Sequence, residues 1–390
     1  MNQRIIGAFL LGAALCIASG PARAMQNVAN TSQQGSLLIF PLINVDPTDT
    51  SDTFIEIGND QSSAVQVECE YVNEEKGRVD FTFTLTHNAV ISWEALEGQG
   101  DVFSVSPFPY GGNYPQLGSD RYGELVCFAV DNSNSHQIAF NHLTGTATVV
   151  NFYDGDAEQT KQAFKYNAWA FAARGTGPGG LANDNVVQGT AGTLWLTGGG
   201  AGTYDACPLY NTALFMPNGA YLGPSGYSIT TLDNDLAVSS CNQDLRQDFN
   251  VHLTKLQFTV YNEIETGFTG AYDCVDSTQD VGLSYADNSY LVAAQNFDYS
   301  TVRTANARFR VQGVASTQCS LTVPNPVNPS TNIIIKSENA GLLGVITSSL
   351  GIDSSYEDQE IGNTTQGAGT EVGYVLWDPG SGGAPARPRH

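Results

Sequence analysis

Residues 79–85 read VDFTFTL and residues 256–261 read LQFTVY, so apolar and polar residues alternate through both stretches. The same period of two recurs in FIEI at residues 54–57 and in VQVEC at residues 65–69. This alternation is typical of antiparallel strands with one face in a core and the other in water. Clusters of Asn, Asp, Gly, Ser and Pro separate such stretches about every 10 residues, a spacing typical of β-sandwiches and barrels. The pattern predicts an all-β protein.

One segment departs from this pattern. Residues 157–164 have a helical composition and follow two acids that could cap a helix, Asp154 and Asp156. They lead into KYNAWAF at residues 165–171, which fits a strand equally well. For residues 157–171 the sequence leaves helix and strand both open.

The order of motifs repeats along the chain. LLIFP at residues 37–41 is echoed by ALFMP at residues 213–217, and a strand that ends in Asn59 is echoed by one that ends in Asn262. In each half a turn and another strand then lead to a cysteine, and further echoes follow in the same order. Similarity in a fixed order predicts a diverged internal duplication, with chance similarity or one large sandwich as the alternatives.

We therefore expect two immunoglobulin-like antiparallel β-sandwich domains. Two domains also agree with a length of 390 residues, at roughly 100–200 residues per domain. The expected boundaries are a signal peptide at 1–24, a first sandwich at 25–174, a Gly/Pro-rich linker at 175–192, a second sandwich with a disulfide-closed insertion at 193–378, and a disordered tail at 379–390.

The first 24 residues predict export. Arg4 precedes an apolar run over residues 5–18, and ARA at residues 22–24 is a small-x-small site for cleavage before Met25. The run is shorter than the roughly 20 residues of a membrane span, so a membrane anchor is the weaker alternative. We expect the mature chain at the cell surface, in the extracellular space or in the periplasm, without a transmembrane span.

The cysteines predict disulfides. Six remain after the signal peptide takes Cys16 with it, and an even number in an exported chain indicates paired thiols. None lies in a C-x-x-C pair, which zinc ribbons and thioredoxin-like sites both need. The duplication predicts three bonds, Cys69–Cys127, Cys274–Cys319 and, closing the insertion, Cys207–Cys241.

The chain is strongly acidic. Its 39 Asp and Glu against 16 Lys and Arg give a formal net charge of −23, which becomes −25 when Arg4 and Arg23 leave with the signal peptide. Nucleic acids and anionic membranes are held by clustered basic residues, so this charge excludes both as electrostatic partners. A hydrophobic content of 41% excludes a disordered acidic chain.

Catalytic motifs are missing from the sequence. It has no HExxH and no GxSxG, and GTGPGG at residues 175–180 lacks the helix that a dinucleotide site needs. Carboxylate pairs are the exception, because glycosidases use two acids that flank the scissile bond. Glu263 with Glu265, and Glu68 with Glu70, are each two apart and would share one face of a strand. The polar face of an amphipathic strand is the simpler explanation.

Acidic loops provide the one cofactor hypothesis, a calcium ion. Carboxylate oxygens in Asn/Gly-rich loops are the ligands that calcium prefers. Three acidic groups supply candidate ligands, namely Asp46, Asp49 and Asp52, then Asp154, Asp156 and Glu158, and finally Asp233 with Asp235. None of them fits an EF-hand, and turn formation is the simpler role for these acids.

Export, paired sandwiches and the lack of a catalytic set together predict a non-enzymatic structural or adhesive protein of the cell surface or extracellular matrix. Its partners would be further copies of itself or other surface components, joined through exposed strand edges. The alternative is a secreted polysaccharide-binding protein or a glycoside hydrolase with a carboxylate pair.

Overall fold

The computed structural model describes residues 28–45, 51–73, 78–96, 100, 122–152, 161–174, 193–198, 202–219, 228–241, 244–246, 253–276, 278–283, 290–325, 328 and 330–353. The expected signal peptide at 1–24, linker at 175–192 and tail at 379–390 lie outside these residues. The regular structure is almost all β and forms several antiparallel sheets, which confirms the all-β prediction.

The strands of the first half are β1 (Leu37–Asn44), β2 (Ser51–Asn59), β3 (Val65–Asn73), β4 (Arg78–Leu85), β5 (Val90–Glu94), β6 (Tyr122–Val130), β7 (Leu143–Phe152), β8 (Lys161–Asn167) and β9 (Trp169–Phe171). The strands that follow are β10 (Ala173–Arg174), β11 (Thr193–Trp195), β12 (Thr203–Tyr204), β13 (Asn211–Phe215), β14 (Ser228–Cys241), β15 (Asp244–Arg246), β16 (Leu253–Tyr261), β17 (Gly267–Asp276), β18 (Thr278–Gly282), β19 (Ala307–Val314), β20 (Ser320–Pro324), β21 (Asn332–Lys336) and β22 (Gly341–Asp353). The helices are η1 (Ala294–Phe297) and α1 (Tyr299–Val302), and within the described residues no helix is long and apolar enough to cross a membrane.

Two sheets of the first half face each other and form the first sheet pair. Their strand orders are β4-β3-β6-β1-β9 and β5-β2-β7-β8. Apolar side chains from both sheets fill the space between them, including Phe40, Ile55 and Val149. Along VQVEC on β3, buried residues alternate with half-buried ones, so the sequence pattern places its apolar face in this core.

Two further sheets form the second sheet pair, with strand orders β13-β19-β16-β17 and β18-β14-β22. Along LQFTVY on β16, the three apolar residues at 256, 258 and 260 have no exposed surface. Their core contains a cluster of phenylalanine rings in tilted and edge-on contact, Phe215, Phe258, Phe297 and Phe309. Because Phe297 belongs to η1, this short helix contributes directly to the core.

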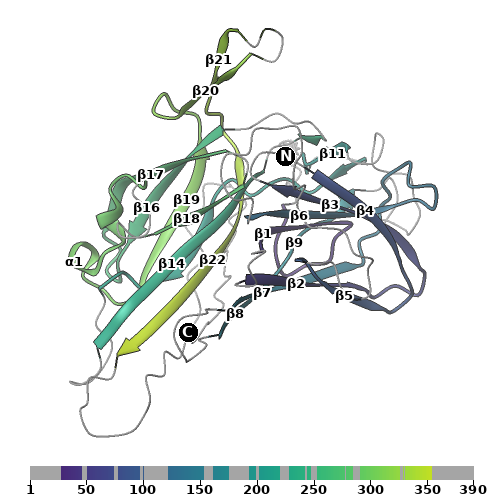
Figure 1. The fold of residues 1–390 in the computed structure, drawn as a ribbon, viewed down its shortest axis with the longest axis horizontal. Coiled ribbons are helices and arrows are strands. Elements are labelled where there is room, and N and C mark those ends of the chain that lie inside the picture. The colour runs from purple at the N-terminus through teal and green to yellow at the C-terminus, as the bar shows by residue number, and fades with distance from the viewer. Residues whose placement is uncertain are drawn as a thin grey trace, which may run out of the picture.

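A third apolar cluster joins the two sheet pairs. Phe128 and Trp169, on the outer face of the five-stranded sheet, pack in it with Leu196 and Tyr204. The indole Nε1 of Trp169 also donates to the carbonyl of Gly344 on β22, at 3.3 Å. The long strands β14 and β22 therefore lie against the first sheet pair, as Figure 1 shows.

The segment that the sequence left open is strand wherever it is described. It forms β8 and β9, and residues 157–160 lie outside the described part. Phe164 and Tyr166 enter the first core while their neighbours at 163, 165 and 167 are exposed. Period-two alternation therefore prevails over helical composition here.

The echoed segments of the two halves are connected differently. β2 and β3 lie in different sheets, whereas β16 and β17 are paired neighbours in one sheet. The side-chain amide of Asn59 donates to the carbonyls of Ser63 and Thr86, at 2.9 and 3.0 Å. These bonds stabilise the connection through which the chain passes from one sheet to the other. The equivalent Asn262 instead accepts the N–H of Thr266 at 2.9 Å and closes a hairpin turn. The sequence similarity does not extend to this connection.

Candidate functional site

A two-stranded ribbon projects from the second sheet pair. We call residues 320–336 the arm, since β20 and β21 pair only with each other and, in Figure 1, stand away from both sheet pairs. Leu321 pairs with Ile335 and Val323 with Ile333, so these four apolar side chains share one face of the ribbon. An unaccompanied ribbon of two strands is at best marginally stable in water.

Strand β21 presents its apolar residues to solvent. Its sequence is NIIIK, and Ile333 and Ile334 are 38% and 64% exposed. The opposite strand ends in Pro324, which has no backbone N–H and cannot extend a sheet at that position. The arm therefore offers the edge of β21 for pairing with another strand.

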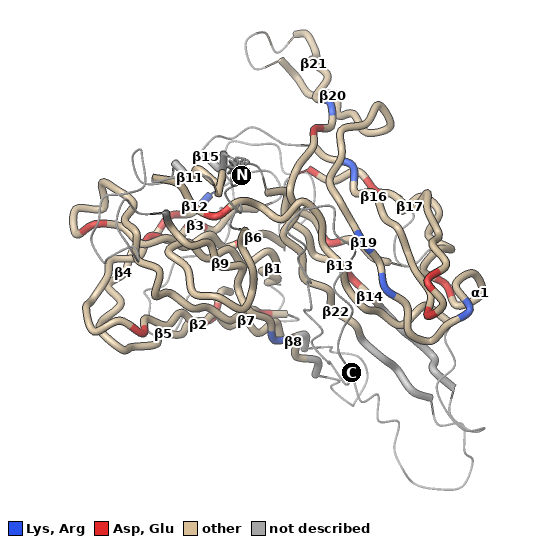
Figure 2. Tube along the Cα trace, turned by 180° about the vertical axis from the view of Figure 1, so that it is seen from behind, with Lys and Arg blue, Asp and Glu red and all other residues tan. Residues whose placement is uncertain are grey.

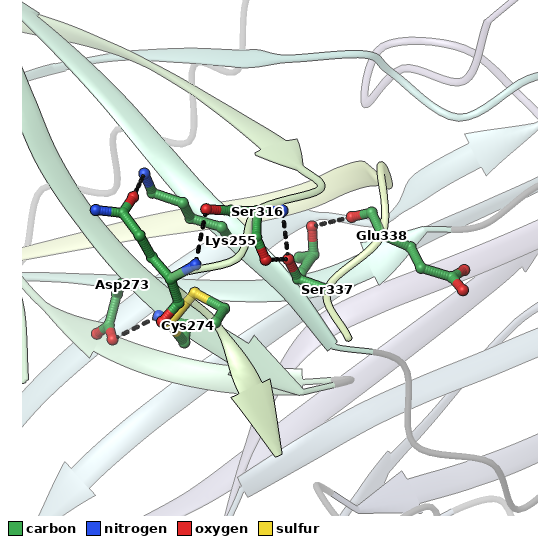
Figure 3. Close-up of a disulfide and its surroundings, with 9 residues drawn as sticks. Lys255, Asp273, Cys274, Ser316, Ser337 and Glu338 are labelled. Carbon is green, nitrogen blue, oxygen red and sulfur yellow. Dashed lines mark hydrogen bonds between the residues drawn. A yellow bond between two sulfur atoms is a disulfide. The ribbon is translucent and has the colours of Figure 1, made fainter. Parts of the chain in front are cut away.

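The base of the arm is firmly held, as Figure 3 shows. Cys319, directly before β20, is joined by a disulfide to Cys274 on β17. Ser337, directly after β21, accepts the N–H of Ser316 at 2.6 Å and donates its hydroxyl to the Ser316 carbonyl at 2.8 Å. Both ends of the arm are thus fixed to the body within one residue of the ribbon.

Neighbouring side chains extend this base. Lys255 on β16 donates to the Gln318 side chain and lies 4.2 Å from the centre of the Tyr272 ring. The carbonyl of Glu338 accepts a hydrogen bond from the hydroxyl of Thr254 at 2.8 Å, and the N–H of Glu338 donates to the carbonyl of Leu253 at 2.9 Å. Hydrogen bonds from β16 therefore hold both the segment that enters the arm and the segment that leaves it.

The arm differs from the rest of the molecule in charge. Lys336 is the one charged residue between positions 320 and 336, whereas the whole chain has 39 acids. In Figure 2 the described part of the arm is tan, with blue at its base and no red. An acidic molecule thus carries a neutral to weakly basic projection.

A second chemically distinct cluster lies where β2 begins and β5 ends. Asp52 is hydrogen-bonded to Glu94, and its Oδ1 accepts the N–H of Thr53 at 2.7 Å and of Leu96 at 3.0 Å. Burial of Asp52, its hydrogen bond to Glu94 and the charge of Glu94 raise its pKa to about 7. The two carboxyl groups can therefore share a proton near neutral pH.

Aromatic side chains lie beside this carboxyl pair. The indole Nε1 of Trp93 donates to the hydroxyl of Tyr71 at 2.7 Å. Burial, together with the charges of Asp52 and Glu94, raises the pKa of Tyr71. The cluster is therefore a buried polar network set into the first core.

The geometry of the carboxyl pair does not suit glycoside hydrolysis. The two acids of a retaining glycosidase are about 5–5.5 Å apart, and those of an inverting enzyme about 6.5–9.5 Å. Because Asp52 and Glu94 are in direct hydrogen-bond contact, no scissile bond fits between them. A structural, proton-sharing contact is what this arrangement supports.

The predicted strand position of Glu263 and Glu265 is wrong. Both are exposed in the turn between β16 and β17, where Glu265 has a φ of 63°. The N–H of Glu265 donates to the carbonyl of Asn262 at 3.0 Å, so the turn begins before either acid. Residues in a turn do not follow the two-residue alternation on which the prediction rested.

Glu68 and Glu70 lie on one face of β3, as expected from their spacing. Glu70 is buried and forms an ion pair with Arg78 at 3.1 Å. Burial and the nearby charge of Asp80 raise the pKa of Glu68. Because Arg78 neutralises Glu70, the two glutamates do not form an isolated like-charge pair.

Of the acids proposed for calcium, the structure describes Asp52, Asp233 and Asp235. The last two lie in the long strand β14 and not in a turn. The other five lie outside the described residues, namely Asp46, Asp49, Asp154, Asp156 and Glu158. In the part of the chain that is described, no group of three or more His, Cys, Asp or Glu side chains could hold a metal ion. Calcium binding stays a prediction.

The cysteines are joined as Cys69–Cys127, Cys207–Cys241 and Cys274–Cys319, the pairs expected from the sequence. The first and last bonds are not equivalent in the fold. Cys69 and Cys127 face each other on adjacent strands β3 and β6, whereas Cys274–Cys319 anchors the arm. The choice of cysteine partners agrees with the predicted duplication, but the positions of the first and last bonds in the fold are not equivalent.

The sequence reasoning missed the arm and Glu94. The arm has a sequence signature, since SLTVP at 320–324 and NIIIK at 332–336 flank NPVNPST, a segment rich in Asn, Pro, Ser and Thr that is typical of a hairpin loop. Glu94 has no such signal, because it meets Asp52 only through the pairing of β2 with β5.

No family model matches the chain, and no curated protein is significantly similar to it. Among solved structures, the crystal structure of PBSX exported protein XepA matches at 8% identity over 74% of this chain and 84% of that chain. Its TM-score is 0.16, which supports no inference about fold or function.

Proposed function

We propose that this protein is an exported, non-enzymatic structural or adhesive protein whose copies associate through the arm. The observation that carries the proposal is the exposure of Ile333 and Ile334 on a ribbon of two strands that projects from the body. Such a ribbon gains stability from a third strand or from a surface that covers its apolar face. A second copy of the arm supplies both.

The charge of the arm favours contact between copies. Each mature chain would have a formal net charge of −25, so two bodies repel each other at low ionic strength. Two arms can approach without bringing acids together, because residues 320–336 contain none. Pairing of β21 with β21 of a second copy is the arrangement we favour, since Pro324 blunts the edge of β20.

Export and the finer architecture belong to the same proposal. Three disulfides indicate folding in an oxidising compartment, in agreement with the expected signal peptide. We infer that the two sheet pairs are two immunoglobulin-like sandwich domains, because each has two antiparallel layers around its own apolar cluster.

Sedimentation of the mature, oxidised protein tests the proposed association. We expect the wild type to shift from monomer to larger species as its concentration rises, and Ile334→Lys to stay monomeric. Ile264 is the matched control, because it is 81% exposed in the turn between β16 and β17. Ile264→Lys should associate like the wild type.

Two results would contradict the proposal. One is a wild type that is monomeric at every concentration, and the other is equal association of the wild type and Ile334→Lys. Electron micrographs of the native material, with and without the arm substitution, then show whether association yields closed pairs or extended assemblies.

A further inference from the structure

A polar pocket lies at the edge of the first sheet pair, far along the chain from the arm. Its volume is about 540 Å³, within the range of roughly 300–1,000 Å³ that small-molecule sites occupy. The turn at residues 31–34 forms one wall, residues 144–146 of β7 form another, and Asn167 at the end of β8 lies between them. Leu38, Ala168 and Ala170 supply an apolar floor.

The polar lining of this pocket is uncharged. It consists of hydroxyl groups and carboxamides, from Thr31, Ser32, Gln33, Gln34, Thr144, Thr146 and Asn167. Hydroxyls both donate and accept hydrogen bonds, and each carboxamide has two donors and one acceptor oxygen. A ligand that matches this lining carries many groups that also donate and accept.

The charged side chains around the pocket already have partners. Gln34 donates to Asp60, whose carboxylate also contacts Nδ1 of His142 at 2.9 Å. On the other side, Glu56 accepts the hydroxyl of Thr146 at 2.8 Å and the ammonium of Lys165 at 3.1 Å. Each of these charged groups is engaged by a neighbouring side chain, and none of them is among the residues that line the pocket. The lining itself therefore offers no charge to a ligand.

Parts of the lining are held in place before any ligand arrives. The Nε2 of Gln33 donates to the carbonyl of Ala170 at 2.7 Å and to Oδ2 of Asp205 at 2.9 Å. Asp205 is 1% exposed, and the same oxygen accepts the N–H of Ala172 at 3.0 Å. A buried carboxylate therefore fixes the wall that the turn at 31–34 provides, which lowers the entropic cost of binding.

Other lining groups have unused hydrogen-bonding capacity. Within the described residues, the side chains of Thr31, Thr144 and Asn167 make no hydrogen bond. They lie on three different walls of the pocket, so they can contact one ligand from several directions. Fixed and unused polar groups above an apolar floor are the usual composition of a small-molecule site.

We propose that this pocket binds a neutral carbohydrate, one or two sugar units of a longer glycan. A neutral sugar has hydroxyls around its rim that suit the hydroxyl and carboxamide lining, and C–H faces that suit the floor of Leu38, Ala168 and Ala170. The site is separate from the arm and belongs to the other sheet pair, so it does not depend on association between copies.

A printed array of neutral oligosaccharides and of acidic ones bearing uronic or sialic acids tests this proposal. We expect the mature protein to bind neutral glycans and to leave the acidic ones. The strongest neutral glycan is then titrated by calorimetry against the wild type and against Thr144→Val combined with Asn167→Leu. Loss of two or three hydrogen bonds should weaken binding about ten-fold or more.

Thr148→Val is the matched control, since Thr148 follows on β7 with the same orientation as Thr144 but does not line the pocket. It should bind like the wild type. The proposal is overturned if neither glycan class binds, if only acidic glycans bind, or if the double variant binds as well as Thr148→Val. Ile334→Lys should keep its glycan affinity, which separates a failure of this site from a failure of the arm.

Discussion

Two disulfides whose cysteines are separated by similar numbers of residues have different structural roles in this molecule. Cys69 and Cys127 are 58 residues apart, face each other across adjacent strands and have no exposed surface. Cys274 and Cys319 are 45 residues apart, and their bond joins an outer strand of the second sheet pair to the root of the arm. One bond joins neighbouring strands of a single sheet within an existing core, and the other attaches a projection to a sheet edge.

The difference shows how a β protein can carry an exposed apolar strand. The arm contributes little to any core, so its position depends on the few bonds at its base, above all the Cys274–Cys319 disulfide and the two hydrogen bonds of Ser337. The strands around Cys69 are held by neighbours on both sides. Covalent anchoring is therefore needed where sheet pairing is least extensive.

Removing each bond is the strongest test of this comparison. Loop-closure entropy gives both disulfides about 4 kcal/mol in the free energy of unfolding, because the closed loops are similar in length. Replacing Cys69 and Cys127 by alanine also leaves a gap in the first core, which adds about 1–2 kcal/mol. We expect this double variant to be the less stable of the two in urea unfolding followed by circular dichroism.

The matched variant replaces Cys274 and Cys319 by alanine. Cys274 is half-buried and Cys319 is 1% exposed, but neither belongs to an apolar core cluster. Truncating them should therefore add less to the loss of loop-closure entropy than truncating Cys69 and Cys127. Equal midpoints, or a lower midpoint for this second variant, would show that the root of the arm is as tightly packed as the first core.

Much of this fold follows from patterns within single strands. VQVEC and LQFTVY become β3 and β16 with the predicted faces buried, because period-two alternation and the pleat of a strand coincide. That the six cysteines pair also follows, since an even number of cysteines in an exported chain indicates disulfides, whereas the choice of partners rested on the order of the echoed motifs. These features depend on neighbours in sequence or on simple counting.

The partners of each strand could not be predicted from the sequence, because contacts between distant segments decide which strands pair. Asn59 and Asn262 occupy equivalent places in the echoed halves, yet one bonds to Thr86 and the other closes a turn with Thr266. The carboxyl pair depends on the same kind of choice, since Glu94 reaches Asp52 only because β5 pairs with β2. Local sequence does not determine which strands become neighbours.

A smaller change tests the base of the arm alone. Ser337 is 6% exposed, and Ser337→Ala leaves the N–H and carbonyl of Ser316 without these partners. Such a loss costs about 1–3 kcal/mol, which we expect as local loosening. Amides of β20 and β21 should exchange about ten-fold faster or more with deuterium, while those of β3 and β6 stay protected.

Ser330→Ala is the control for that measurement, since Ser330 lies in the exposed loop between β20 and β21. It should leave the exchange of both regions unchanged. Faster exchange across the whole protein in Ser337→Ala would mean that arm and body unfold as one unit. The Cys274–Cys319 bond would then not anchor a separately held projection, and the two disulfides would not differ in role.

The remaining test of this comparison concerns pH and belongs to the first sheet pair. Asp52 has a pKa of about 7 in the folded protein and an ordinary value of 3.8, so between these values the folded state binds the extra proton. Its contribution to stability is therefore complete below pH 3.8 and is lost as pH rises through about 7, with a slope on the order of 1 kcal/mol per pH unit.

Asp52→Asn isolates this contribution from the other acids. Asparagine can still accept the N–H of Thr53 and Leu96, and it can donate to Glu94 at every pH. We expect the variant to gain stability relative to the wild type between pH 4.5 and 7.5, as measured by urea unfolding at both values. A constant difference would show that Asp52 is ionised throughout, and a difference of opposite sign would show that its carboxylate stabilises the fold. Because the carboxyl pair lies in the first sheet pair and not at the arm, exchange of the β20 and β21 amides should be the same in Asp52→Asn and the wild type.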